Sequence, residues 1–255
     1  MRKKTYGMPC AVCFLLALAL LSAACFSASA EEVNVLAGSI PMLVNKDHPV
    51  DPDFVPADLV LLADVLDSSL VTLQNKNIKA VRTAAEALEI MLEAAKADGI
   101  RNWKINAAYR SISDQQALLE NRIRNYLKNN SGWSRSRAKS AALRTVAEPG
   151  CSEHHLGLAI DITVKGASAF KGTKQCKWLH AHCWEYGFIV RYQEGKEAVT
   201  GFTAEEWHIR YVGTGHSLAI RDANYCLEEY LDGMPEDAGS FLVEDTEEDL
   251  FFGNP

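Results

Sequence analysis

Several short motifs of common hydrolases and metal proteins are missing from this 255-residue chain. It has no His-Glu-x-x-His segment, which argues against the familiar zinc-binding helix of metalloproteases. It has no Gly-x-Ser-x-Gly segment, so the nucleophile turn of serine hydrolases is excluded. After the first thirty residues no Cys-x-x-Cys pair occurs, which argues against a structural zinc ribbon. Any metal or catalytic site must therefore be built from residues in another pattern.

Lysine and arginine are absent from residues 222–255, which carry eleven acidic side chains. Residues 31–221 hold 22 acidic and 23 basic side chains, so the net charge of −7 arises in the C-terminal segment. Nothing in this distribution indicates nucleic-acid binding. The composition predicts that residues 233–255 form an acidic, disordered tail.

Cysteine is scarce once the N-terminal segment is set aside. The four remaining cysteines are Cys151, Cys176, Cys183 and Cys226. Cys176 and Cys183 lie seven residues apart on an expected helix, about 10 Å between Cα atoms, which is too far for a disulfide. A Cys183–Cys226 bridge stays open. With 48% hydrophobic residues, the chain can bury a sizeable core without disulfides.

Residues 1–30 are typical of a secretory signal peptide. Arg2, Lys3 and Lys4 precede an uncharged apolar run over residues 11–24, and Ala-Ser-Ala at 28–30 fits a cleavage site. Two alternatives stay open. Residues 8–26 are long enough for an uncleaved membrane anchor, and Cys25 could be lipidated, although Ser22 fits that motif poorly. All three alternatives place the protein outside the cytoplasm.

The order of expected elements predicts one domain of the α+β class. After an extended, Pro- and Asp-rich lead-in over residues 31–59, helices are expected over residues 77–99, 113–129 and 134–150. Strands are expected over residues 103–111, 157–164, 188–192 and 206–213, with further helices at 173–187 and 215–231. This order predicts a domain over residues 60–232 with a small antiparallel sheet flanked by helices.

Three polar clusters interrupt apolar, strand-like segments at residues 106–111, 152–161 and 204–213. His154 or His155, with Asp161 and His208, would supply two imidazoles and one carboxylate, a set that suits a catalytic zinc with an open position for water. Glu205 could move the proton. An odd spacing places Glu205 and His208 on opposite faces of a straight strand. We therefore expect the backbone to turn at residues 205–207, before the strand begins.

The segment "SEHHLGLAID" resembles the Ser-x-His-x-x-Gly-x-Ala-x-Asp signature of the VanY-type D-alanyl-D-alanine carboxypeptidases. These belong to the LAS zinc metallopeptidases, named for lysostaphin, D-Ala-D-Ala carboxypeptidase and sonic hedgehog. "EEWHIRYVG" resembles their Glu-x-Trp-His-x-Arg-Tyr-Val-Gly segment, and "AYRS" followed by "DQQALLEN" also resembles the family. The likeness runs in matching order over residues 43–230 and implies a LAS, hedgehog-like zinc peptidase fold.

The resemblance assigns roles by position. It implies that a single zinc ion is bound by His154, Asp161 and His208, and that Glu205 is the general base. Arg110 falls where the family has an arginine near the scissile carbonyl, where it would stabilise the oxyanion. Less specifically, the likeness implies that Ser152 and Gln116 hold the substrate.

Two departures and one ambiguity accompany these assignments. Glu206 stands where the family commonly has proline, which leaves a second carboxylate beside the expected base, and Cys151 stands where a threonine is common. Side chains alternate along a strand, so His155, six residues before Asp161, would share its face and is favoured as the metal ligand. The position of the histidine in the family motif instead favours His154. His154 can be the ligand only if the strand begins after the histidines. We then expect His155 to line the cleft or face solvent.

The sequence therefore predicts an exported zinc carboxypeptidase that removes the terminal D-alanine from peptidoglycan stem peptides by attack of zinc-bound water. The choice between a D,D and an L,D bond stays open. The expected partners are stem peptides, with no nucleic acid, membrane contact only through the N-terminal segment, and a monomeric chain. The alternatives are an endopeptidase of the same fold and a non-catalytic zinc-containing binding module. Glu205 and Arg110 argue against the second, because a structural zinc needs neither.

Overall fold

The computed structural model describes residues 41–234. The predicted signal peptide, the first part of the lead-in and the acidic tail from residue 235 lie outside these residues. No helix within the described range is long and apolar enough to cross a membrane. The descriptions below concern this range alone.

A five-stranded sheet forms the centre of the fold, with strand order β2-β4-β5-β7-β6. The strands are β2 (Val71–Leu73), β4 (Trp103–Ala107), β5 (Ala159–Val164), β6 (Phe188–Tyr192) and β7 (Glu205–Tyr211). All neighbouring pairs are antiparallel except β2 with β4, which are parallel at one edge. A separate ribbon pairs β1 (Leu59–Leu61) with β3 (Lys79–Val81). The predicted α+β class is confirmed, and the parallel edge strand is an addition to it.

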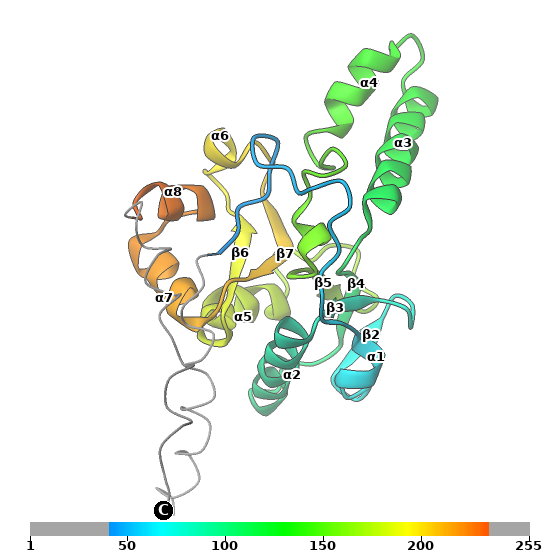
Figure 1. The fold of residues 1–255 in the computed structure, drawn as a ribbon. Helices are drawn as coiled ribbons and strands as arrows, with labels where there is room; N and C mark the ends of the chain where they lie inside the picture. The colour runs from blue at the N-terminus through cyan, green and yellow to red at the C-terminus, as the bar shows by residue number, and fades with distance from the viewer. Residues whose placement is uncertain (1–40, 235–255) are drawn as a thin grey trace, which may run out of the picture. The chain divides into compact units, whose positions relative to one another are not determined.

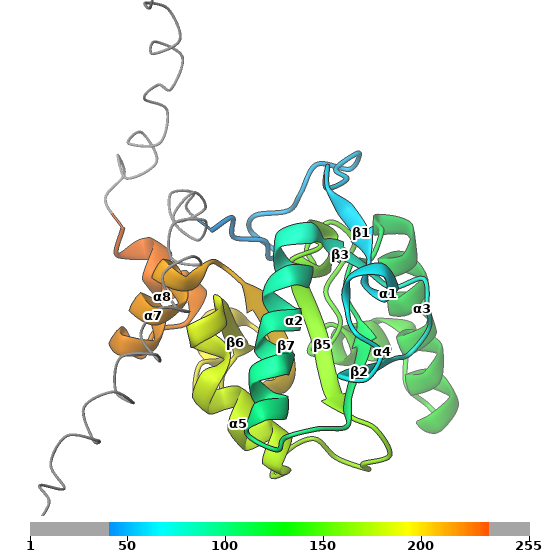
Figure 2. The ribbon, with the colours of Figure 1, turned by 90° about the horizontal axis from the view of Figure 1, so that it is seen from below.

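Helix α2 (Arg82–Ala97) covers one face of this sheet (Figure 2). Its buried side chains recur three or four residues apart, as on an amphipathic helix: Ala84, Ala85, Leu88, Met91, Leu92 and Ala95. All of them except Ala84 join the main core with apolar residues of β4 and β5. The helix begins at Arg82 rather than near residue 77, because residues 79–81 pair as β3. The predicted end near Gly99 is confirmed, with Gly99 in the left-handed region at φ +76°.

The remaining helices follow the chain around the sheet. The short α1 (Leu62–Val65) precedes β2, and α5 (Lys174–His182) with the 3₁₀ helix η3 (Cys183–Tyr186) packs into the main core. Beyond β6 lie α6 (Glu197–Thr200), α7 (Thr214–Ala223) and α8 (Leu227–Asp232), the last two beside a smaller core around Ile189 and Ile220. Ile160, Ile162 and Ile209 join the main core, so the alternating residues of β5 and β7 face the opposite side of the sheet.

Helices α3 (Ile112–Asn129) and α4 (Arg135–Ala142) project together from the sheet (Figure 1). They share a small core of Leu119, Ile123, Ala138, Ala142 and Val146. Ser111 caps α3 by accepting a hydrogen bond from the Asp114 N–H, so the helix begins at Ile112, one residue before the predicted start at residue 113. The shared core and the cap together stabilise α3.

All four described cysteines are free, including Cys183 and Cys226, so the bridge left open by the sequence is not formed. Cys183 is fully buried in the main core, where burial raises the pKa of its thiol far above the ordinary value. It therefore acts as a small apolar core residue.

Candidate active site

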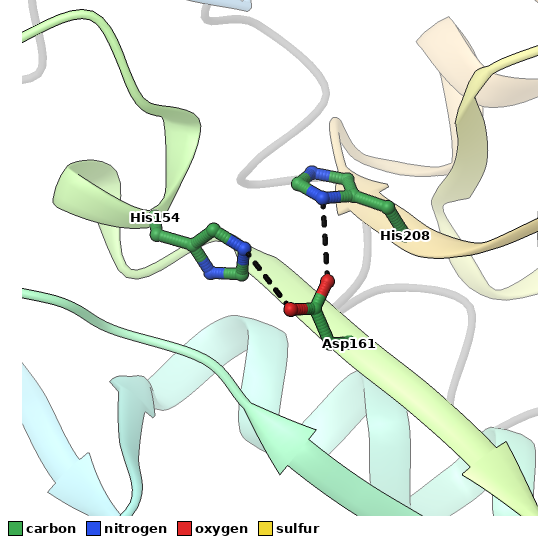
Figure 3. A group of neighbouring side chains, drawn as sticks. All are labelled: His154, Asp161 and His208. Atoms are coloured by element: carbon green, nitrogen blue, oxygen red, sulfur yellow. Dashed lines mark ion pairs between the residues drawn. The ribbon is translucent and has the colours of Figure 1, made fainter. Parts of the chain in front are cut away.

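His154, Asp161 and His208 come together on one face of the sheet, with one donor atom from each within 4.8 Å of the others (Figure 3). Asp161 on β5 is the direct cross-strand partner of His208 on β7, which places both side chains on the same face. His154 reaches them from the 3₁₀ helix η2 (Glu153–Leu156). Within residues 41–234 this is the single group of three such side chains close enough to hold a metal ion.

The donor atoms of this group fit a zinc ion. The Nδ1–H of His154 donates to the Ala108 carbonyl oxygen at 2.6 Å, so Nε2 is left facing Asp161 Oδ2 at 3.5 Å. His208 presents Nδ1 to Asp161 Oδ1 at 3.3 Å. Asp161 Oδ1 is buried without a hydrogen-bond partner in the described chain, as expected of an atom placed to bind a cation. Two imidazoles and one carboxylate are the usual protein ligands of a catalytic zinc.

The electrostatics of the group also favour a cation. Burial alone would favour the neutral acid of Asp161, but His154 and His208 hold its pKa well below the usual range. Burial opposes protonation of His208, yet Asp161 and Glu153 raise its pKa to about 9. Burial lowers the pKa of His154, which keeps this ring neutral and able to coordinate. A metal ion would replace the proton that the surrounding carboxylates favour on His208.

The local backbone decides which adjacent histidine reaches the site. Residues 153–156 form a 3₁₀ turn that ends at Gly157, and β5 starts only at Ala159, so the expectation that the chain is not yet a strand is confirmed. Gly157 has φ +67°, and a Cβ there would lie 2.9 Å from a Leu59 methyl group. This turn directs His154 toward Asp161.

His155 does not line the cleft or face solvent, so that expectation is wrong. It is 1% exposed, and its Nδ1–H donates to the Arg110 carbonyl oxygen at 2.7 Å. Its Nε2 accepts a hydrogen bond from the Gly150 N–H at 3.1 Å. With both ring nitrogens engaged by backbone groups, His155 ties the loop before η2 to the segment that carries Arg110.

Glu205 lies beside the metal-binding group, with Oε2 3.7 Å from His208 Nδ1. The expected turn before the strand is wrong, because Glu205 already belongs to β7. Instead of a turn before the strand, the structure has a register shift in the pairing of β7 with β6. Val190 pairs with Ile209 but Tyr192 pairs with Glu205, so a step of two residues along β6 corresponds to a step of four residues along β7. This bulge lets Glu205 and His208 serve one face despite their odd spacing.

Burial raises the pKa of Glu205 to about 7, and the negative Asp161 adds to the rise, whereas His208 opposes it. A carboxyl group with this pKa can both accept and donate a proton near neutral pH. Burial raises the pKa of Glu206, the second candidate, but an ion pair with Lys171 at 2.9 Å and a hydrogen bond from its own backbone N–H together lower that pKa below its ordinary value. The structure therefore separates the two carboxylates and leaves Glu205 in the cleft.

A change of Glu205 should be visible in the stability of the metal-free protein. Its pKa of about 7 exceeds the ordinary value near 4.5, so the folded chain holds this proton more tightly than the unfolded chain. The resulting stability is complete below pH 4.5 and is lost as the pH rises through 7. Glutamine stays neutral, so Glu205→Gln should match the parent at pH 4.5 and exceed its free energy of unfolding by about 2 kcal/mol at pH 8. Denaturant unfolding with chelator at both pH values measures this, and an equal stability difference at both would contradict it.

A cleft of about 370 Å³ opens beside the metal-binding group. Its walls include Arg110, Ser152 and Glu205, together with Tyr192 of β6 and Arg122 of α3. Ser152 is buried and accepts a hydrogen bond from the His154 N–H at 3.4 Å, so it shapes η2 as well as the cleft. Arg110, Ser152 and Glu205 thus lie where the sequence predicted a site, and their roles stay predictions.

Gln116 does not line this cleft, and its part in substrate binding stays a prediction; the adjacent Gln115 lines the cleft instead. Gln116 is exposed and its amide donates to Glu120 at 3.3 Å. Gln115 is 1% exposed, accepts a hydrogen bond from Arg110 Nη1 at 2.8 Å, and donates to the Ala147 carbonyl oxygen at 2.7 Å. One residue along a helix rotates a side chain by about 100°, which is enough to move it from cleft to solvent.

Gln115→Ala should therefore release the Arg110 guanidinium and lower kcat/KM about tenfold or more, since a misplaced catalytic group loses much of its effect. Gln116→Ala is the matched control and should leave kcat/KM within about twofold, as expected of an exposed position. Steady-state kinetics of both variants provide the measurement. Equal effects of the two changes would refute the role given to Gln115.

Sequence reasoning missed Gln115, Tyr192 and Arg122, because each reaches the cleft through tertiary packing. Both glutamines fall within the predicted helix over residues 113–129, but the sequence does not show which of them faces the cleft. Tyr192 is the last residue of β6, and its ring lies 5.0 Å from that of His208. No local motif marks such contacts.

Comparisons with known proteins agree with the metal-binding group and the cleft described above. A family model described as VanY, D-alanyl-D-alanine carboxypeptidase, matches residues 77–214. The protein YodJ of Bacillus subtilis strain 168 is 36% identical over 199 residues, which cover 76% of this chain and 67% of the relative. Against the first three curated relatives, the chain spans 61% to 67% of their length.

Two solved structures share the fold. One is a variant of the vancomycin-resistance D,D-pentapeptidase VanY in complex with Zn(II), with 33% identity, a TM-score of 0.63, and coverage of 74% of this chain and 97% of that chain. The other is the L,D-carboxypeptidase LdcB, with 33% identity, a TM-score of 0.62, and coverage of 76% and 86%. The likeness therefore extends over about three quarters of this chain.

Proposed function

The chain belongs to the VanY family of D-alanyl-D-alanine carboxypeptidases, and we propose that it is an exported, zinc-dependent carboxypeptidase that trims the terminal D-alanine from peptidoglycan stem peptides. The observation that carries the proposal is the buried group of His154, Asp161 and His208, with Glu205 and Arg110 in the same cleft. Export is supported by the basic, apolar and small-residue pattern of residues 1–30.

Nε2 of His154, the carboxylate of Asp161 and Nδ1 of His208 would hold the zinc ion. When bound, zinc supplies a Lewis acid that lowers the pKa of a water molecule to about 7. The remaining chemistry belongs to the protein. Glu205 accepts a proton as the amide is attacked and delivers it to the leaving D-alanine nitrogen, and its pKa of about 7 suits both steps.

Arg110 supports the reaction from the wall of the cleft. Gln115 holds its guanidinium through a 2.8 Å hydrogen bond, so the group is oriented before the substrate arrives. A fixed guanidinium stabilises the carbonyl oxygen as it gains negative charge, and removal of one such donor commonly costs about 10²-fold in rate. This arrangement favours catalysis over a purely structural metal site.

The cleft also favours removal of a terminal residue over cleavage within a chain. A carboxypeptidase must bind the free carboxylate of its substrate, and arginine is well suited to that task. Arg122 lines the cleft in addition to Arg110, so one arginine is available for the carboxylate and one for the reacting carbonyl.

The test is D-alanine release from defined peptides. The zinc-loaded protein is incubated with a stem pentapeptide, a stem tetrapeptide, the pentapeptide carrying a C-terminal amide, and a cross-linked dimer. We expect release from the pentapeptide, the tetrapeptide or both, and weak reaction with the amide. The pattern over the first two peptides assigns D,D or L,D specificity. Loss of the dimer without D-alanine release would identify an endopeptidase, and no reaction with any peptide would support a binding module.

A further inference from the structure

Glu153 is the neighbour of His154 in η2, yet its side chain lies on the far side of His208 from Asp161. The carboxylate is fully buried, and its Oε1 forms ion pairs with Arg191 Nε at 2.8 Å and Arg210 Nη1 at 2.9 Å. These three side chains form a charged cluster inside the protein. Neither the sequence motifs nor the proposed reaction gives Glu153 a role.

The second oxygen of Glu153 faces His208. Oε2 lies 3.7 Å from His208 Nε2, and both atoms are buried without a hydrogen-bond partner in the described chain. Nδ1 of the same ring faces Asp161 at 3.3 Å. The imidazole therefore lies between two carboxylates, with one at each ring nitrogen.

We propose that Glu153 is a positioning residue that selects the tautomer and orientation of His208. A neutral imidazole carries one N–H, and a carboxylate beside Nε2 favours placing the hydrogen there. Nδ1 then keeps its lone pair and points it toward His154 and Asp161. The inference rests on the proposed zinc site and adds a residue that makes His208 a competent ligand without touching the metal.

The buried arginines explain how Glu153 keeps its place. Arg191 is anchored from the other side by Glu228 of α8, through hydrogen bonds of 2.8 and 2.6 Å. Arg210 donates from Nη2 to the Met42 carbonyl oxygen at 2.9 Å. Both arginines require an acceptor, so they hold Oε1 and leave Oε2 directed at His208. A chain of contacts thus runs from α8 through Arg191 and Glu153 to His208.

Glu153→Gln tests this arrangement with little change of volume. The arginines should hold the amide oxygen, which turns the NH2 group toward His208 Nε2 and favours the wrong tautomer. Zinc affinity should fall about 10- to 100-fold, the usual effect of removing such a partner. Glu228→Gln is the matched control, because it also removes a carboxylate from Arg191 but does not face His208. Its zinc affinity should fall less than that of Glu153→Gln, because the change can reach His208 only through Arg191 and Glu153.

Zinc affinity is measured by competition with a chromophoric chelator, and thermal unfolding of the metal-free proteins verifies that both variants fold. Equal weakening by Glu153→Gln and Glu228→Gln, or unchanged affinity in Glu153→Gln, would overturn the inference. Absence of zinc binding by the parent protein would instead overturn the proposed site. If Glu153→Gln does not fold, ¹⁵N NMR of the zinc-loaded parent decides. Metal on Nδ1 and hydrogen on Nε2 of His208 support the role of Glu153, and the reverse refutes it.

Discussion

Replacing Glu205 with glutamine should lower kcat for D-alanine release by about 10²-fold or more while zinc content stays at the parent level. The amide keeps the shape of the side chain but cannot accept the proton that the reaction must move. Glu205 lies 3.7 Å from His208 and outside the group of three metal-binding side chains, so its change should spare the metal. Rates with the preferred peptide and metal analysis of the same sample measure the two effects.

Glu206→Gln is the control for this experiment. Glu206 carries the same functional group one residue further along β7, but it pairs with Lys171 rather than facing His208. Its replacement should change kcat by less than about threefold, as for other surface positions. If Glu206→Gln is the inactive variant and Glu205→Gln is active, the assignment of the general base is wrong by one residue.

His154→Ala should abolish stoichiometric zinc binding and with it D-alanine release. Two ligands would remain, and a catalytic zinc site needs three protein ligands. His155→Ala should keep zinc, because both ring nitrogens of His155 contact backbone groups outside the metal-binding group. Loss of those two hydrogen bonds should instead lower the free energy of unfolding by about 2 kcal/mol.

Metal analysis after dialysis and denaturant unfolding of both variants separate these outcomes. The adjacent histidines make a matched pair, equal in residue type and both buried. Zinc retained in His154→Ala and lost in His155→Ala would reverse the assignment of the ligand.

The sequence predicted those parts of the site that short-range pattern determines. Strands were predicted over residues 157–164 and 206–213, and β5 and β7 overlap these segments, but their direct pairing was not predicted. The choice of His154 over His155 required the position of the histidine in the family motif, because the alternation of side chains along a strand favoured the other residue. The structure gives the physical reason in the 3₁₀ turn of residues 153–156.

The parts that sequence could not supply depend on tertiary contacts. The bulge in β7 is a property of its pairing with β6, so no pattern within residues 205–211 reveals it. Gln115 and Gln116 are chemically identical, and only the phase of α3 against the cleft distinguishes them. Arg191 and Arg210 read as strand residues, whereas their pairing with Glu153 brings together segments 38 or more residues apart.

The account depends most directly on zinc held by His154, Asp161 and His208. The protein is stripped with chelator, incubated with the stem pentapeptide and tetrapeptide, and titrated with zinc while D-alanine is measured. We predict no release from the stripped protein and recovery of activity that is complete near one zinc ion per chain. Full activity in the stripped protein, or no activity at any zinc concentration, would contradict the central claim.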